Sequence, residues 1–477
     1  MLSAKLITPK KVNVLGSVLA GRMIHRFAIC FFLFGFVVAV QAQDNSPYSR
    51  YGMGDLVPST NIINRGMGSF SAGYHDMFSV NFNNPASYAF FQSFKEQKSK
   101  QLQAGRAILD IGINLENRAL REPNNIEKFN ASNAIFSHVQ LGVPLSPKWG
   151  LSFGLRPVSR ISYKIGRSSL LTDPNTGQPI DSAFTLNQGD GGAYLASMGV
   201  GHRINISANH TLALGINGGY FFGKKDYSNR LNIFNDSLLY NAGNFQTITS
   251  YGDLYFNAGL QYVVRLKSNM LLTLGAYGNW KQSIKATQDI TRETYTYSES
   301  AGYLQLDSVS VQKDRKGEIV YPSSYTYGFV LEQIGGVNKP SWMVGMDFLQ
   351  SKWSDYRFYG EADPTVKDRW ELRLGGQIRP IPKRNYFSNV AYRAGFFTGP
   401  DYIYIGKKLP VTGVSLGLGL PIANYSRMTS PDQVTFLNLA FEFIKRGNND
   451  SQLKENLFRL SAGFSLTDLW FRKRKYE

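Results

Sequence analysis

The stretch from Gln43 to Tyr88 decides how the rest of the chain is interpreted. It contains Tyr48-Ser49-Arg50-Tyr51-Gly52-Met53-Gly54, then Asn64-Arg65-Gly66-Met67-Gly68, and it closes on Asn81-Phe82-Asn83-Asn84-Pro85-Ala86-Ser87. The stretch is rich in Gly, Asn and Ser and has neither a helical nor a strand period. Residues after about 100 have the pattern of β-strands, and a barrel formed by these strands would have an interior that another part of the chain must fill. We therefore predict that this stretch is a compact segment folded into the mouth of a barrel.

The composition of the 477-residue chain argues against an ordinary soluble α/β protein. Aromatic residues make up 14% and charged residues 18% of the chain, against roughly 25% charged residues in typical soluble domains. Past residue 42 no run approaches the ~20 apolar residues of a membrane helix. A mildly polar chain rich in aromatic residues and glycine is typical of a membrane β-barrel, because only every second residue faces lipid.

The first 42 residues read as a secretory signal peptide. The pair His25-Arg26 precedes an apolar run over residues 27–40, and Val40-Gln41-Ala42 predicts cleavage after residue 42. Met23 stands where such a signal normally begins. Two readings remain open: a true start at Met23, or a longer basic segment before the apolar run. The predicted divisions are 1–42 as signal peptide, 43–100 as an N-terminal hatch with a spacer, and 101–477 as a transmembrane β-barrel.

Export and charge limit the partners of the mature chain. Its only cysteine, Cys30, lies in the signal, so the mature chain would hold no disulfide and no thiolate metal site. The formal net charge is +18, and residues 1–42 carry five basic and no acidic residues, which leaves +13 for the mature chain. Because the protein is exported, we predict no nucleic acid partner. Outer-membrane lipid and lipopolysaccharide are the predicted partners of the basic surplus.

Beyond residue 100 apolar and polar residues alternate with a period of two, as in half-buried strands. Phe458, Leu460 and Phe464, for example, alternate with Arg459 and Ser461. We count fourteen strands, near residues 101–115, 131–143, 148–162, 192–206, 210–224, 246–266, 270–288, 318–336, 341–350, 366–379, 388–398, 411–422, 432–445 and 455–471.

Short connections alternate with long ones along these strands, and the longest, 163–191 and 289–317, read as polar outer loops. Short turns on one side and long loops on the other are typical of outer-membrane barrels, whose short turns face the periplasm. In lipid every backbone N–H and C=O must be paired internally, so the sheet has to close. The predicted fold is therefore an all-β, antiparallel transmembrane barrel of about fourteen strands in the outer membrane of a Gram-negative bacterium.

Motifs of enzyme chemistry are absent from the sequence. There is no phosphate-binding G-x-x-x-x-G-K-[ST] loop and no H-E-x-x-H, and the five histidines lack ligand spacing. We predict no catalytic residue, no metal and no cofactor. Charged residues on the polar faces of the strands are interpreted as lining the lumen, solvated or paired with one another. They are Asp347, Glu371, Arg373, Glu442 and Arg459.

The third strand carries a proline, Pro157, in the run Trp149-Gly150-Leu151-Ser152-Phe153-Gly154-Leu155-Arg156-Pro157. Proline has no N–H to donate, so within sheets it is confined to edges and bulges, and a closed barrel has no edge. Pro157 therefore either lies beyond the membrane or marks a kink and a gap in the wall. Gly154 would ease bending there, and we identify Gly154 and Pro157 as a candidate lateral opening.

Several short motifs resemble the FadL-type outer-membrane transporters. They are the segment ending in Asn84-Pro85-Ala86, a Lys352-Trp353-Ser354 element after Gly345-x-Asp347, and Tyr392-Arg393-Ala394-Gly395-Phe396 before Ser415-Leu416-Gly417-Leu418-Gly419. The resemblance implies a fourteen-stranded barrel, an N-terminal hatch and a kinked third strand that opens the wall sideways. It also implies energy-independent uptake of long-chain fatty acids and other hydrophobic compounds.

The hatch residues follow from the same motifs. Before a proline the chain is pushed to extended conformations, so Asn84, Pro85 and Ala86 predict a rigid turn. Gly66 and Gly68 would allow close packing against the wall.

Two hypotheses for the function follow. The first is a transporter for passive uptake of a hydrophobic, fatty-acid-like small molecule with lateral release controlled by the hatch. The alternative is a barrel that transports nothing and serves as an accessory subunit of a secretion or assembly complex, with other outer-membrane proteins as partners. An apolar cavity of roughly 300–1,000 Å³ beside the hatch would favour transport. A lumen packed solid, with an apolar patch on the outer loops, would favour the accessory role.

Overall fold

The computed structural model describes residues 46–95, 102–123, 127–235, 240–298, 302–336, 339–422 and 434–470. The predicted signal peptide and the candidate start at Met23 lie outside the described residues. Within them no helix is long and apolar enough to cross a membrane.

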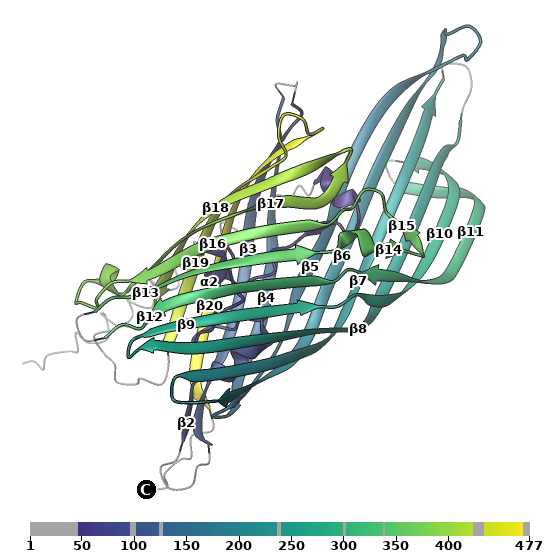
Figure 1. The fold of residues 1–477 in the computed structure, drawn as a ribbon. Helices are drawn as coiled ribbons and strands as arrows, with labels where there is room; N and C mark the ends of the chain where they lie inside the picture. The colour runs from purple at the N-terminus through teal and green to yellow at the C-terminus, as the bar shows by residue number, and fades with distance from the viewer. Residues whose placement is uncertain are drawn as a thin grey trace, which may run out of the picture.

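The described chain forms an antiparallel barrel of fourteen strands that closes between the last and the first (Figure 1). In order around the wall they are β3 (Leu102–Arg121), β4 (Phe129–Ser146), β5 (Trp149–Thr172), β6 (Pro179–Asn205), β7 (His210–Phe234), β8 (Ala242–Lys267), β9 (Met270–Asn279) continued by β10 (Gln282–Ser298), β11 (Gly302–Tyr321) continued by β12 (Ser324–Gln333), β13 (Ser341–Ser351), β16 (Arg369–Arg379), β17 (Ala391–Ile405), β18 (Lys407–Pro421), β19 (Val434–Arg446) and β20 (Lys454–Trp470). The predicted fold class is confirmed.

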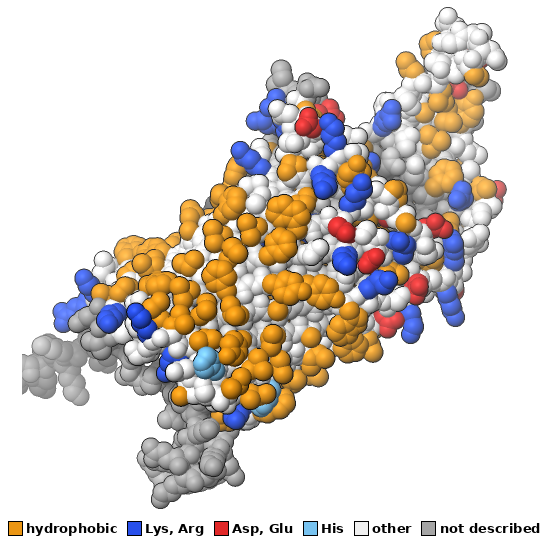
Figure 2. Space-filling model, in the orientation of Figure 1, with side chains coloured by type: hydrophobic (Ala, Val, Ile, Leu, Met, Phe, Trp, Pro, Cys, Tyr) orange, Lys and Arg blue, Asp and Glu red, His pale blue; other side chains and the backbone are white. Residues whose placement is uncertain are grey.

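The alternation of side chains places apolar residues on the outside of this wall. Leu416 is 63% and Met198 60% exposed, whereas Ser415, the polar neighbour of Leu416, points to the other face and is buried. Figure 2 shows hydrophobic side chains gathered in a broad band over the middle of the barrel, with charged side chains towards its two ends. Such a band is the lipid-facing surface of a membrane barrel.

The two stretches interpreted as polar outer loops, 163–191 and 289–317, are mostly strand, and this expectation was wrong. β5 continues to Thr172 and β6 begins at Pro179, while β10 and β11 leave only a short tip between Ser298 and Gly302. In Figure 1 the β5–β6 extension rises well above the barrel, and β10 and β11 project beyond it on the right. A sheet outside the membrane meets water on both faces, so its strands lose the apolar alternation that identified the spanning parts.

Shorter elements complete the chain. Before the barrel come η1 (Pro47–Arg50), β1 (Asp55–Leu56), α2 (Ile62–Arg65), η2 (Pro85–Phe90) and β2 (Ser93–Lys95). Between β13 and β16 lie η3 (Trp353–Asp355), β14 (Arg357–Phe358) and β15 (Glu361–Ala362), and η4 (Tyr386–Asn389) precedes β17. β14 pairs with the edge of β11 at Ile319 and Val320.

Residues 46–95, here called the N-terminal segment, contact strands on all sides of the wall. A Cβ on Gly275 of β9 would lie 2.0 Å from the carbonyl oxygen of Ala72, and one on Gly395 of β17 would lie 2.0 Å from the nitrogen of Gly68. Wall glycines therefore let the backbone of the segment approach the backbone of the strands. The segment runs through the lumen and does not stop at its mouth.

Candidate functional site

The turn at Asn84 joins the N-terminal segment to the wall strand β8. The Asn84 amide nitrogen donates to the carbonyl oxygens of Ala72 (2.7 Å) and of Leu260 in β8 (3.1 Å). Its side-chain oxygen accepts from the N–H of Ala86 (3.1 Å) and so caps η2, in which Pro85 is the first residue. These hydrogen bonds matter because water cannot reach a buried amide to replace them. Asn84 thus holds the turn both to the rest of the segment and to β8.

Gly66 and Gly68 face the opposite part of the wall. A Cβ on Gly66 would lie 2.9 Å from the Cα of Gly417 in β18. Gly68 has a φ of +71°, and its N–H donates to the hydroxyl of Ser415 (2.9 Å). A Cβ on Gly68 would meet the carbonyl oxygen of Leu374 at 2.4 Å. A side chain at this position would therefore be both strained and obstructed.

Asp347 of β13 binds the backbone of the segment directly. Its carboxylate Oδ2 accepts from the N–H groups of Ser71 (2.6 Å) and Ala72 (2.9 Å), and the residue is fully buried. Next to it Arg373 of β16 donates to the carbonyl of Ser69 (3.2 Å) and to the Glu371 carboxylate (2.7 Å). These predicted lumen-lining residues thus meet the segment as well as each other.

Glu442 and Arg459 belong to a larger ionic cluster. Arg459 of β20 contacts the carboxylates of Glu442 (3.2 Å) and Glu116 (2.7 Å). Glu116 also contacts Arg118 (2.8 Å) on the same strand, β3. Buried ions need such partners, because desolvation otherwise costs several kcal/mol per charge.

The carboxylate that joins this cluster to the N-terminal segment is Asp55 of β1, which was not predicted from the sequence. Asp55 contacts Arg118 (2.8 Å) and Arg446 of β19 (2.9 Å). Glu455 contacts the same two arginines at 3.0 and 3.3 Å, and Asp401 contacts Arg446 at 2.6 Å. The segment therefore supplies one carboxylate to an ion-pair network that the wall otherwise completes.

Arg65 of α2 was also missed and is the most buried cation of the segment. It is 0% exposed, and its guanidinium donates to the carbonyls of Thr60 (3.0 Å) and Pro58 (3.1 Å). It also donates to Asn114 of β3 (2.5 Å) and Ser137 of β4 (2.8 Å). The available signal was a single arginine between Asn64 and Gly66.

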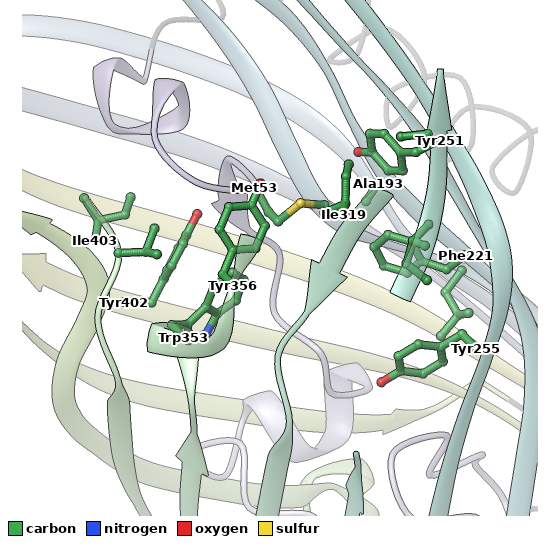
Figure 3. Close-up of a cluster of buried hydrophobic side chains, with 14 of the residues drawn as sticks. Met53, Ala193, Phe221, Tyr251, Tyr255, Ile319, Trp353, Tyr356, Tyr402 and Ile403 are labelled. Carbon is green, nitrogen blue, oxygen red and sulfur yellow. The ribbon is translucent and has the colours of Figure 1, made fainter. Parts of the chain in front are cut away.

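An aromatic cluster covers the outer half of the segment. Figure 3 shows Met53 lying between Tyr356 and Ile319, with Trp353 and Tyr402 beside Tyr356. The rings of Trp353 and Tyr402 are 4.1 Å apart between centroids. From β7, Lys225 donates to the carbonyl of Gly52 (2.6 Å) and to the Tyr356 hydroxyl (2.9 Å). The Trp353 element noted in the sequence therefore folds inward over the segment.

The wall changes its pairing beside Pro157. β4 and β5 pair from Ser146 and Trp149 as far as Val139 and Leu155, and there the ladder between them stops. Beyond this point β4 remains paired with β3, and β5 remains paired with β6. We call the interval between residues 129–138 of β4 and 156–172 of β5 the seam. Pro157 lies at its start, where the register with β6 shifts between Pro157 and Ser159.

The N-terminal segment occupies the free edge of β5 along the seam. β1 pairs antiparallel with β5, Asp55 opposite Arg160 and Leu56 opposite Ser159. Val57 N–H donates to the carbonyl of Val158 (3.0 Å). The edge of β5 thus exchanges a neighbouring strand for a two-residue strand of the segment. The role of Pro157 and Gly154 as an opening stays a prediction.

A cavity of about 280 Å³ lies between the segment and the wall. Its lining combines charged groups of the ionic cluster with apolar side chains such as Val158, Tyr255 and Leu349. Arg156 of β5 also lines it and lies 5.6 Å from the centroid of the Phe82 ring. Among the described residues no carboxylate forms an ion pair with Arg156, unlike the other arginines of the lining. Nor does the described chain contain a group of three or more His, Cys, Asp or Glu suited to a metal ion.

A family model described as BamG matches residues 23–477. The chain belongs to the BamG family. No protein in the curated set matches the sequence. Among solved structures, a FadL homologue of Pseudomonas aeruginosa has a TM-score of 0.50 at 12% identity, covering 88% of this chain and 100% of its own.

Two further solved structures are similar. The toluene transporter TodX of Pseudomonas putida has a TM-score of 0.47 at 14% identity, covering 87% of this chain and 99% of its own. The monoaromatic hydrocarbon channel CymD has a TM-score of 0.45 at 12% identity, covering 87% and 98%. This BamG-family chain therefore has the fold of FadL-type outer-membrane barrels, as the sequence motifs predicted.

Proposed function

We propose that the protein is a passive transporter in the outer membrane of a Gram-negative bacterium, which takes up a hydrophobic small molecule and releases it sideways into the membrane. One observation carries the proposal: the β4–β5 ladder ends at Val139 and Leu155, and among the described residues only the segment covers the edge beyond it. An unpaired strand edge in lipid costs several kcal/mol per polar group. A wall that keeps such an edge and closes it with a separate segment is suited to opening there.

Residues 55–58 of the segment separate the lumen cavity from the seam. They line the 280 Å³ cavity, and they also line a second cavity of about 30 Å³ together with Ile135 of β4 and Ser162 of β5. Moving this short stretch would join the two cavities. In this proposal β1 is the gate, and the rest of the segment is the hatch that holds it.

The lining of the cavity favours a ligand with an apolar body and one negative charge. Arg156 supplies a cation with no carboxylate partner among the described residues, next to Pro157. Val158, Tyr255 and Tyr321 line the same cavity and would contact an alkyl chain. A guanidinium binds a carboxylate through two parallel hydrogen bonds. A long-chain fatty acid has this chemistry.

A disulfide between β1 and β5 tests the proposal. Leu56 and Ser159 are opposite each other in an antiparallel pair, whose Cα atoms lie about 4.5–5.5 Å apart, within the range for a disulfide. In a Cys30→Ser background, Leu56→Cys with Ser159→Cys gives a locked variant. Cells expressing it should take up labelled oleate when the disulfide is reduced and lose that uptake when it is oxidised.

The control places the same bond in a wall that is already closed. Thr398 of β17 and Thr412 of β18 are paired, with their hydroxyls 3.1 Å apart. Thr398→Cys with Thr412→Cys should leave oleate uptake independent of oxidation. Equal uptake by the oxidised and reduced locked variant would refute lateral release at the seam.

An accessory role in a multiprotein complex is the second candidate, and one observation favours it. The strand extensions above the barrel expose large apolar side chains, among them Leu170 (71%), Val309 (68%) and Phe234 (58%). Large exposed apolar groups often mark protein interfaces. Native mass spectrometry after extraction in mild detergent separates the two functions. A defined protein complex that the substitutions Leu170→Lys and Phe234→Lys dissolve, with no oleate uptake by wild type, would favour the accessory role.

A further inference from the structure

An apolar cavity that is wide open to its surroundings lies on the outside of the barrel wall. It has a volume of about 590 Å³ and crosses β3 to β7. Its lining is apolar apart from one serine: Leu109, Val139, Leu141, Phe153, Gly154, Leu155, Ala196, Ser197, Met198, Gly218 and Gly219. We call this cavity the trough.

The pairing of the strands shows that the trough faces lipid. Phe153 and Met198 are opposite each other in β5 and β6 and are 45% and 60% exposed. Next along this face, Met198 is opposite Gly218 of β7, and Leu155 is opposite Ala196. The small residues Ala196 and Gly218 thus form the floor of the trough between the larger side chains of the same face. The hollow follows from the absence of side chains at Gly218 and of bulk at Ala196.

The position of the trough ties it to the seam. Val139 and Leu155 line the trough, and they are also the last residues paired between β4 and β5. A molecule leaving the lumen through the seam would meet the trough at its first contact with the lipid-facing wall. No charged side chain lines the trough, so it would accept an alkyl chain and not a polar head.

We infer that the trough is an exit site that binds the alkyl chain of the transported molecule as it leaves the seam. The inference rests on the proposed function and adds a binding site to it. A chain can enter the trough at little cost, because its apolar lining resembles the membrane around it. The trough therefore directs the chain along the wall as it leaves the seam.

Filling the trough tests the inference. Gly218→Leu with Ala196→Leu would occupy its floor without touching the lumen, and a Cβ on Gly218 meets only the Phe256 ring, at 3.3 Å. Oleate uptake by this filled variant should fall by about tenfold or more, the scale at which added bulk excludes a ligand from an apolar pocket. The matched control is Ala394→Leu with Ala462→Leu. Both residues are partnered by lipid-facing residues, Leu416 and Ile113, away from the trough.

Photolabelling gives a second readout that does not depend on uptake. Palmitate carrying a diazirine, added outside cells that express the protein, should label Phe153 and Met198 when the 56–159 disulfide is reduced. Oxidation should abolish this labelling. Equal labelling in both states would show that the chain arrives from the bilayer, as an annular lipid does, and would overturn the inference.

The outcomes separate this inference from the proposed function. Normal uptake by the filled variant, together with uptake that the disulfide still blocks, would remove the trough from the path and leave the seam in place. Uptake insensitive to the disulfide would refute the proposed function itself. Loss of uptake in the filled variant but not in its control, with labelling confined to the reduced state, supports the trough.

Discussion

Val139 of β4 and Leu155 of β5 form the last pair between these two strands, although both strands continue well beyond it. The next residues bonded to the free edge of β5 belong to β1 of the N-terminal segment. A closed barrel normally has no edge to protect. Here the edge of β5 is covered by β1, which belongs to the N-terminal segment inside the lumen. A movement of the segment would therefore also open or close the wall at this edge.

Replacing Pro157 should strengthen the wall and slow transport. Pro157→Val restores an N–H where the β4–β5 ladder stops, and one additional hydrogen bond adds roughly 0.5–1.5 kcal/mol. We expect a slightly higher free energy of unfolding, measured by urea titration in detergent, and slower oleate uptake. Pro410→Val, in the closed β17–β18 pair, is the control and should not slow uptake. Unchanged uptake in the Pro157 variant would mean that the proline has no part in opening.

Asp347 should be essential for seating the segment. Asp347→Ala removes the acceptor of two N–H groups, those of Ser71 and Ala72, and hydrogen bonds to a charged group contribute about 1.5–3 kcal/mol. Protease should then cleave residues 60–80 in the folded, detergent-solubilised protein, whereas wild type should resist. Asp347→Asn keeps one acceptor oxygen and should give an intermediate cleavage rate. Resistance of the alanine variant would show that the segment is held by other contacts alone.

Gly68 offers a way to separate backbone strain from packing. Gly68→Ala carries strain at φ +71° and a Cβ that would meet the Leu374 carbonyl at 2.4 Å. Gly177, in the outer β5–β6 hairpin, has φ +67° with nothing within 4 Å, so Gly177→Ala carries the strain only. A left-handed conformation costs a non-glycine residue about 1–3 kcal/mol. Unfolding in urea should show a clearly larger loss for Gly68→Ala, and equal losses would mean that the close contact relaxes freely.

Arg156 should recognise the charge of the ligand. Arg156→Gln is expected to weaken oleate binding by about tenfold or more, because a hydrogen bond to a charged group contributes about 1.5–3 kcal/mol. Binding of oleyl alcohol, which has the same chain without the charge, should not change. Arg369→Gln is the control, since Arg369 lines the same cavity but already contacts Glu371 at 3.3 Å. A similar loss for oleyl alcohol would assign Arg156 to packing against Phe82.

The fold could be predicted from the sequence because lipid and lumen impose opposite demands on alternate residues. The period of two identified all fourteen spanning strands, including β9 and β12, whose continuations β10 and β11 were mistaken for a loop. Above the membrane that demand disappears, and residues 163–172 carry polar side chains on both faces. Polar composition then cannot distinguish a strand from a loop.

The site was predictable only in part. Placing Asp347 and Arg373 on the lumen face followed from alternation, but their partners are backbone groups of Ser71, Ala72 and Ser69, which leave no trace in side-chain pattern. Asp55 and Arg446 are 391 residues apart in the chain, and no local signal joins them. The alternation in the sequence indicates which face of the sheet a charged side chain lies on. Its partner depends on how the closed barrel brings distant strands and the N-terminal segment together.

The central claim is that β1 leaves the edge of β5 during transport, and the most direct test is to measure that movement. In a Cys30→Ser background, Leu56→Cys leaves one cysteine, whose reaction rate with a maleimide reports how often β1 leaves the edge of β5. The account predicts slow reaction in the resting protein and a rate that rises with oleate concentration, while Thr412→Cys on the closed β17–β18 pair reacts at a constant rate. Continued oleate uptake with no change in the rate at residue 56 would contradict a gate at the seam.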